Sequence, residues 1–471
     1  MKKLILFLFI PLVSFGQVAI PQSEIYTIVD LWIDNPTHQV FTDINNPTGY
    51  VGHISEWNTS NVTDMSSLFY NKTEFNDDIS AWDVGNVTDM SKMFAGTSNN
   101  DPMSFNQAIG DWDVSNVINM EEMFEYSTSF NQPIGNWDVS NVTDMSRMFR
   151  SANSFNQPIG DWDVSNVTDM SRIFQSTGYF NQPIGSWNVS NVTDMYAMFS
   201  GNHSFDKPIG NWDVSSVTDM SFLFHAAQAF NQDISNWDVS SVTDMEGMFE
   251  FAESFNQPIG NWDVSNVIYM KNMFEFAVSF NQPIGNWDVS NVTSMKVMFS
   301  DAESFNQPIG NWDVSNVFDM SYMFWGADSF NQPIGDWDVS NVNNMDYMFY
   351  SLAFYQDISS WCVTNITSEP TYFCWGCSLP QSYLPDWGTC PSFGLDEQNQ
   401  LDISIHPNPS SDYISVNIDS ELEAVVFDLL GKELIREKIT GRLDISSLEK
   451  GTYILNLTDG INTSIHKIIK E

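Results

Sequence analysis

A 25-residue unit recurs through the middle of this chain, and it limits the possible folds more than any other feature. The copy that begins at Phe130 reads FNQPIGNWDVSNVTDM. Its tryptophan returns from Trp57 to Trp361, with one five-residue insertion and one single-residue shortening. Repetition at a fixed period of this length predicts a solenoid, in which each unit packs only on its neighbours. Because a solenoid offers a long surface rather than a deep cleft, binding is the expected kind of function.

The spacing of apolar residues predicts one strand and one helix in each unit. The second half carries a helical stripe, made by Val142, Met145, Met148, Phe149 and Ala152. Asn141 stands where an N-cap is needed, and Asp144 could close a capping box. The first half, residues 132–139, is expected to form a short strand with an extended turn. Together these patterns predict an α/β repeat solenoid of the leucine-rich-repeat type over residues 55–361, followed by a small all-β sandwich.

The first 54 residues read as a signal peptide and a capping segment. Lys2 and Lys3 precede an apolar run, which is typical of a secretory signal peptide over residues 1–16. Residues 17–54 are expected to cap the solenoid with an amphipathic helix behind Ser23 as N-cap. The apolar face of that helix is Ile25, Ile28, Val29 and Trp32. No later stretch has the roughly 20 apolar residues of a membrane-spanning helix.

All four cysteines lie just after the last repeat tryptophan, in residues 362–391, which we interpret as a C-terminal cap. They are Cys362, Cys374, Cys377 and Cys390. An exported protein is expected to hold them as disulfides, and four cysteines allow three connectivities. A zinc site is the alternative, since Cys374 and Cys377 have ligand spacing. Residues 392–404 then read as a linker.

The charge of the chain excludes one class of partner. The formal net charge is −43, from 60 acidic and 17 basic residues. Nucleic acid is therefore excluded as a partner, because phosphate binding needs clustered cations. Such an acidic coat favours cationic partners.

Repeated carboxylates raise the question of calcium or of hydrolysis. Asp161 and Asp163 form one of several DxD pairs, but the equivalent of Asp144 is Tyr269 or Ser294 in other copies. Capping tolerates such changes better than a calcium site does, so we expect no cofactor, with calcium as the less favoured alternative. The sequence shows no catalytic triad around its few histidines, and we expect a protein that is not an enzyme.

Positions that vary on this regular lattice are where a ligand could be recognised. Aromatic residues recur there at 25-residue spacing, and they are the candidate ligand contacts: Phe251, Phe276, Tyr322, Tyr347, Trp325 and Tyr350. The alternative interpretation is packing between neighbouring repeats.

The last segment, residues 405–471, has alternating strand patterns and resembles the type A sorting domain of the type IX secretion system. The resemblance rests on HPNPSSDYISVNI from His406, VVFDLLGKEL from Val425 and LDISSLEKGTYIL from Leu443. It implies export across the outer membrane, after which the passenger is anchored or released. The motif residues carried over are Pro407, Asn408, Pro409, Asp428, Gly431, Lys432, Leu448, Gly451, Tyr453 and Lys467.

The repeats, read as WDVSNVTDMSRMF from Trp137, resemble the BspA-like leucine-rich-repeat surface proteins, among which are adhesins for host proteins and partner bacteria. The FNQPIG half replaces the leucine-rich half usual in that family. These patterns favour a secreted protein of the outer-membrane surface or extracellular space that binds a protein or polysaccharide partner and uses the type IX machinery. A stalk or surface-coat component without a specific ligand is the alternative, and a polysaccharide hydrolase is the third hypothesis.

Overall fold

The structure is a computed structural model in which the chain divides into two compact units, residues 1–390 and 391–471. It describes residues 19–35, 52–352, 354–377, 379–391, 403–418, 420–428, 432–460 and 462–471. The predicted signal peptide lies outside the described residues.

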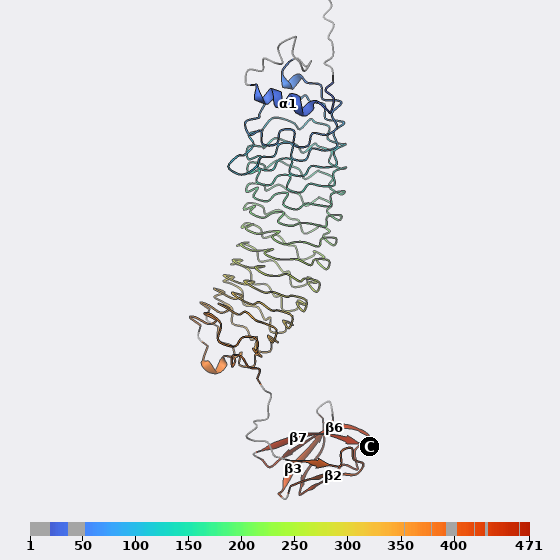
Figure 1. Ribbon diagram of the computed structural model, residues 1–471, viewed down its shortest axis with the longest axis vertical. Coiled ribbons are helices and arrows are strands. Elements are labelled where there is room, and N and C mark those ends of the chain that lie inside the picture. Colours follow the sequence, from blue (N-terminus) through green and yellow to red (C-terminus); the bar gives the residue numbers. More distant parts are fainter. Residues whose placement is uncertain are drawn as a thin grey trace, which may run out of the picture. The chain divides into compact units, whose positions relative to one another are not determined.

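The first unit is a stack of irregular coils, one for each 25-residue repeat (Figure 1). Successive coils meet through isolated parallel bridges, such as that between Asp144 and Asp169. Beside each bridge, alternate backbone amides donate to the next coil, as Arg147 N does to Ser171 O at 2.8 Å. The core inside the stack is one continuous cluster of the repeated apolar side chains.

The predicted α/β repeat with one strand and one helix per unit is wrong. Residues 142–152 form successive turns, because Arg147 and Ser151 have φ of 55° and 58° and therefore cannot continue a right-handed helix. Met148 N bonds to Met145 O, three residues back, while the amides between these turns bond to the next coil. The expected strand half is likewise a run of turns and extended chain without a ladder.

Of the residues predicted as helix caps, Asn141 joins neighbouring coils and Asp144 closes a local turn. Asn141 donates its side-chain N–H to Ser115 O at 2.7 Å. The Asp144 carboxylate accepts the N–H of Ser146 at 2.8 Å, two residues on, which closes a local turn.

The other half of each coil is tied to its neighbours by side chains too. Trp162 donates Nε1–H to Ile134 O at 3.1 Å. Asn156 accepts the N–H of Asn181 and the side-chain N–H of Gln182, at 3.0 and 2.9 Å. These contacts recur along the stack, and we call this half of the coil, residues 130–142 in the copy with Trp137, the framework half.

Helix α1 (Ile25–Asp34) covers the N-terminal end of the stack with Ile25, Ile28, Val29 and Trp32 buried. Its N-cap is Glu24 rather than Ser23, and no side chain bonds the cap. The short 3₁₀ helix η2 (Ile54–Glu56) follows.

Both predicted disulfides are present at the other end, and their pairing resolves the open connectivity. They join Cys362 to Cys390 and Cys374 to Cys377. A second 3₁₀ helix, η3 (Gln381–Tyr383), lies between them in the chain.

The second unit contains two antiparallel sheets around a single buried cluster. One sheet has the order β1-β2-β5 and the other β4-β3-β6-β7. The strands are β1 (Ile405–His406), β2 (Tyr413–Val416), β3 (Leu422–Phe427), β4 (Glu433–Ile439), β5 (Arg442–Asp444), β6 (Gly451–Thr458) and β7 (Thr463–Lys470).

Several residues of the predicted sorting motif make structural contacts in this unit. Asn408, between Pro407 and Pro409, donates to Lys467 O at 2.7 Å and accepts the N–H of Ile469 at 2.8 Å. The remaining motif contacts are these: Asp428 accepts the N–H of Lys432, Tyr453 donates to Glu449 O, Leu448 packs on the core and Gly451 begins β6. Gly431 lies outside the described residues.

Within the part of the chain that the structure describes, no helix has the length and apolar character needed to cross a membrane.

Candidate binding face

Three columns of varying residues run along the turn half of the coils, which is residues 143–154 in the copy with Trp137. The 147 column runs from Glu122 to Tyr372 in steps of 25, the 150 column from Glu125 to Trp375, and the 151 column from Tyr126 to Gly376. Backbone amides make the contacts between coils here, as Ser151 N does with Gln175 O at 2.8 Å. The side chains are therefore free to differ from coil to coil.

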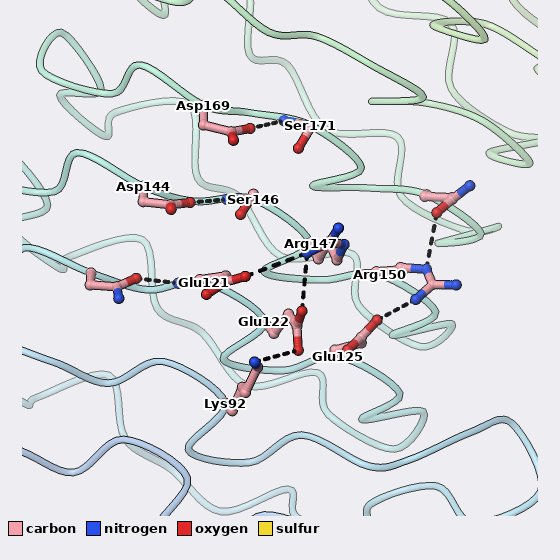
Figure 2. Close-up of polar contacts among 12 residues, drawn as sticks. Lys92, Glu121, Glu122, Glu125, Asp144, Ser146, Arg147, Arg150, Asp169 and Ser171 are labelled. Atoms are coloured by element: carbon pink, nitrogen blue, oxygen red, sulfur yellow. Dashed lines mark hydrogen bonds and ion pairs between the residues drawn. The ribbon is translucent and has the colours of Figure 1, made fainter.

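Ion pairs between coils fill the first part of these columns (Figure 2). Arg147 reaches back to Glu121 and Glu122 at 3.4 and 3.1 Å, and Lys92 lies 3.5 Å from Glu122. Arg150 pairs with Glu125, whose side chain is 8% exposed. Burial raises the pKa of Glu125, with Glu122 adding to the effect, while Arg150 opposes it. Lys92, Arg147 and Arg150 therefore neutralise carboxylates of the same face, whereas Arg172 lies over the Tyr196 ring at 4.6 Å.

Carboxylates crowd together in the middle of the stack. Burial raises the pKa of Glu250 to about 7, and the charges of Glu275 and Glu246 add to this. Burial likewise raises the pKa of Glu275, although a hydrogen bond from Asn272 lowers it in part. This region carries less negative charge at neutral pH than its composition implies.

The 150 column also brings together Ser200, His225 and Glu250, a juxtaposition that the sequence analysis missed. The Ser200 hydroxyl lies 3.0 Å from His225 Nδ1, and His225 Nε2 lies 4.0 Å from Glu250. Their 25-residue spacing is the signal that could have revealed it. Ser200 is only 6% exposed, so its hydroxyl is not presented to a substrate, and burial lowers the pKa of His225.

The predicted aromatic contacts lie half-buried at the later coils, stacked on one another. Phe251 and Phe276 have ring centroids 4.6 Å apart, and Tyr322 and Tyr347 4.7 Å apart, each pair nearly parallel. Trp325 and Tyr350 are tilted by 48° at 6.2 Å. The structure thus brings the candidates together in two separate groups: one is the pair Phe251 and Phe276, and the other is Tyr322, Tyr347, Trp325 and Tyr350.

Stacking along the columns decides which part of each ring a partner can touch. In each stacked pair the two rings cover the faces that they turn toward each other, so a partner can touch only the ring edges and the remaining faces. The columns end at Tyr372 and Trp375, which are 53% and 57% exposed. Sequence reasoning missed these two residues because they lie beyond the last tryptophan of the repeat.

Repeated carboxylates outside the columns have local structural partners. Hydrogen bonds from the hydroxyl and the N–H of Ser140 lower the pKa of Asp138. Asp163, of a DxD pair, accepts the N–H of Ser165 at 3.1 Å. Across the described residues, no group of three or more His, Cys, Asp or Glu side chains is arranged to hold a metal ion.

Comparison with known proteins gives two family matches. The model for the family described as Mycoplasma protein of unknown function, DUF285, matches residues 37–157, 97–208, 194–307 and 277–387, more than half of the chain. A secretion system C-terminal sorting domain matches residues 404–471. This second match indicates export by type IX secretion to the cell surface or extracellular space. None of the curated proteins matches the chain.

Proposed function

Since the chain belongs to the family described as Mycoplasma protein of unknown function, DUF285, and carries a sorting domain, we propose that it is a non-enzymatic surface binding protein. Its relatives in this proposal are the BspA-like surface proteins, and its role is adhesion to a protein or polysaccharide partner. The lateral columns of the turn half make the contacts.

One observation carries this proposal: chemical variety is concentrated in the columns. Along the 150 column, three consecutive coils carry Ser300, Trp325 and Tyr350, while the framework half repeats almost unchanged. Variation at half-exposed positions on a constant scaffold is how repeat proteins distinguish ligands. Aromatic edges with hydroxyl groups suit a partner that offers both apolar and hydrogen-bonding groups.

The test is a glycan and protein array probed with the full chain, with and without calcium. We expect a selective, saturable signal that survives moderate salt. Changing four aromatic residues to alanine should weaken it at least tenfold: Phe251, Phe276, Tyr322 and Tyr347. A matched variant with Thr168→Ala, an exposed residue outside the columns, should bind normally. Undiminished binding by the four-residue variant would disprove the role of the columns.

A stalk or coat component is the second candidate, favoured by the uniform contacts of the framework half, which need no ligand. It predicts self-assembly without any partner. Static light scattering of the full chain would show mass growing with concentration, whereas a strict monomer would contradict it.

A further inference from the structure

The two ends of the coil stack are closed differently. At the N-terminal end, Gln22 donates to Asp64 O at 2.8 Å and Tyr26 to Ser66 O at 3.0 Å, so two of the outward carbonyls there are occupied. At the C-terminal end the cap covers the framework half, where Val363 N donates to Thr389 O at 2.8 Å. Trp387 of the cap also packs on Phe373, but no described segment accepts the outward backbone amides of the turn half of the last coil, residues 370–376.

The turn half of the last coil presents a row of backbone donors. In the preceding coil, Tyr347 N donates to Thr371 O and Ser351 N to Trp375 O, both at 2.9 Å. The equivalent donors of the last coil have no acceptor among the described residues; they are the N–H groups of Tyr372, Cys374 and Gly376. Between all the preceding coils, donors on alternate residues meet carbonyls on alternate residues of the next coil, which lie in the same series of turns.

A proline removes one donor from this row of outward N–H groups but does not remove the others. Met145 N donates to Asp169 O of the next coil, and other coils repeat the contact. Pro370 takes the place of that methionine in the last coil, so a fourth outward N–H is absent. Proline at an edge is a common means of limiting uncontrolled pairing, and here three donors remain.

Aromatic faces flank the donors. Tyr372 lies 5.3 Å from Tyr347, and Trp375 stacks on Tyr350 at 5.0 Å, so one face of each terminal ring is covered. Their exposed sides border a surface depression of about 360 Å³, which Glu369 and Pro370 help to line. If another coil followed, two aromatic side chains three residues apart would lie against Tyr372 and Trp375. Tyr322 and Trp325 lie in this way against Tyr347 and Tyr350.

We propose that this end binds a segment of another protein that adopts the turn conformation of a further coil, adds one parallel rung and carries two aromatic residues three positions apart. The acidic chain favours a segment with basic flanks. A second copy of the chain is the wrong partner, because helix α1 covers the N-terminal end and residues of its segment already bond two of the outward carbonyls, and two C-terminal ends would oppose donor to donor. The inference rests on the chain being a binding protein but uses its end, not its lateral columns.

The probe is a fluorescent peptide copying residues 318–326, FDMSYMFWG, with two lysines added at each end. Titration with the full chain should give saturable anisotropy, and a scrambled peptide should not bind. The double variant Tyr372→Ala, Trp375→Ala should lose at least tenfold in affinity. The matched pair Tyr322→Ala, Trp325→Ala, two coils away, should bind as the wild type does.

Hydrogen exchange on the wild-type chain tests the backbone contact without any variant. The peptide should slow exchange at the amides of Tyr372, Cys374 and Gly376. Absence of binding, or binding indifferent to the terminal pair, overturns the proposal. So does slow exchange at these amides in the free chain, because a segment of the chain itself or a second copy then occupies the edge. If the glycan and protein array shows no binding but the peptide still binds, only the proposed role of the lateral columns is rejected.

Discussion

The two halves of each coil solve the same problem, contact with the next coil, in different ways. In the framework half, side chains such as Trp162 and Asn156 make the hydrogen bonds between coils. In the turn half, backbone amides such as Arg147 N make them. Where a side chain supplies the contact, its identity is constrained. Where the backbone supplies it, arginine, glutamate, phenylalanine and tyrosine can occupy one column.

Glycine substitution should reveal this difference with the largest effect. A Cβ on Gly160 would lie 2.3 Å from Pro183 O, a backbone atom of the next coil. Gly160→Ala therefore forces two coils apart, and we expect a loss of about 3 kcal/mol in the free energy of unfolding. Urea denaturation followed by tryptophan fluorescence measures it.

The control is Gly178→Ala in the turn half, where the nearest atom to the new Cβ is His203 Cδ2 at 4.0 Å. It should change stability by no more than about 0.5 kcal/mol, since alanine also lowers the entropy of the unfolded chain. Equal losses at the two glycines would contradict the division of the coil into two halves.

The asparagine ladder should show the next largest effect. Asn156→Ala leaves the N–H of Asn181 without its acceptor and leaves the Gln182 side chain with only its bond to the backbone O of residue 156, at a cost of about 2 kcal/mol. Asn156→Asp keeps the acceptor, as Asp206 does for Asn231 N at 3.1 Å two coils later. Thermal unfolding should therefore rank alanine well below aspartate, and equal midpoints would argue against a ladder held by side-chain acceptors.

The sequence predicted the buried residues of each coil better than their backbone. Val142, Met145 and Met148 are all fully buried, as the stripe required. Their three-residue spacing fits a helix, but it fits equally a series of turns that repeat every three residues. Left-handed φ at Arg147, a residue that normally favours helix, is imposed by contact with the next coil, which no local pattern reveals.

The candidate site was predictable only where one column repeats one kind of residue. Tyr322 and Tyr347 stand out as a pair at 25-residue spacing, and the structure stacks them. Ser200 and His225 lie in one column but differ in chemical type, so no repeated residue marks them and only the structure reveals their contact. The open edge at Tyr372 was also beyond sequence reasoning, because it depends on where the cap stops covering the stack.

Crowded carboxylates in the turn half should give a smaller, pH-dependent effect. Because the folded pKa of Glu250 is raised to about 7, the folded chain holds a proton that the unfolded chain releases near pH 4.5. The contribution of Glu250 to the stability of the fold is therefore fully present below pH 4.5 and is lost as the pH rises through 7. We expect a contribution of about 1–2 kcal/mol, reduced by solvent screening.

Glu250→Gln should abolish this part of the decline between pH 5 and pH 8 in urea titrations at several pH values. Glu253→Gln, an exposed carboxylate of the same coil, should leave the slope unchanged. A steeper decline in Glu250→Gln than in the wild type would show that the sign of the effect is wrong.

Apart from the Gly178→Ala control, the smallest effect should come from the same glycine-to-alanine change placed at a left-handed position of the turn half. Gly201 has φ of 69°, yet Ala226 holds φ of 53° at the equivalent place in the next coil. A Cβ on Gly201 would meet the Ser176 hydroxyl at 3.3 Å, a side-chain atom that can rotate away. Gly201→Ala should therefore cost about 1 kcal/mol, from backbone strain alone. Urea denaturation measures this loss in the free energy of unfolding. A loss as large as that of Gly160→Ala would contradict the view that glycine is required in the framework half because its Cα lies against a backbone atom of the next coil.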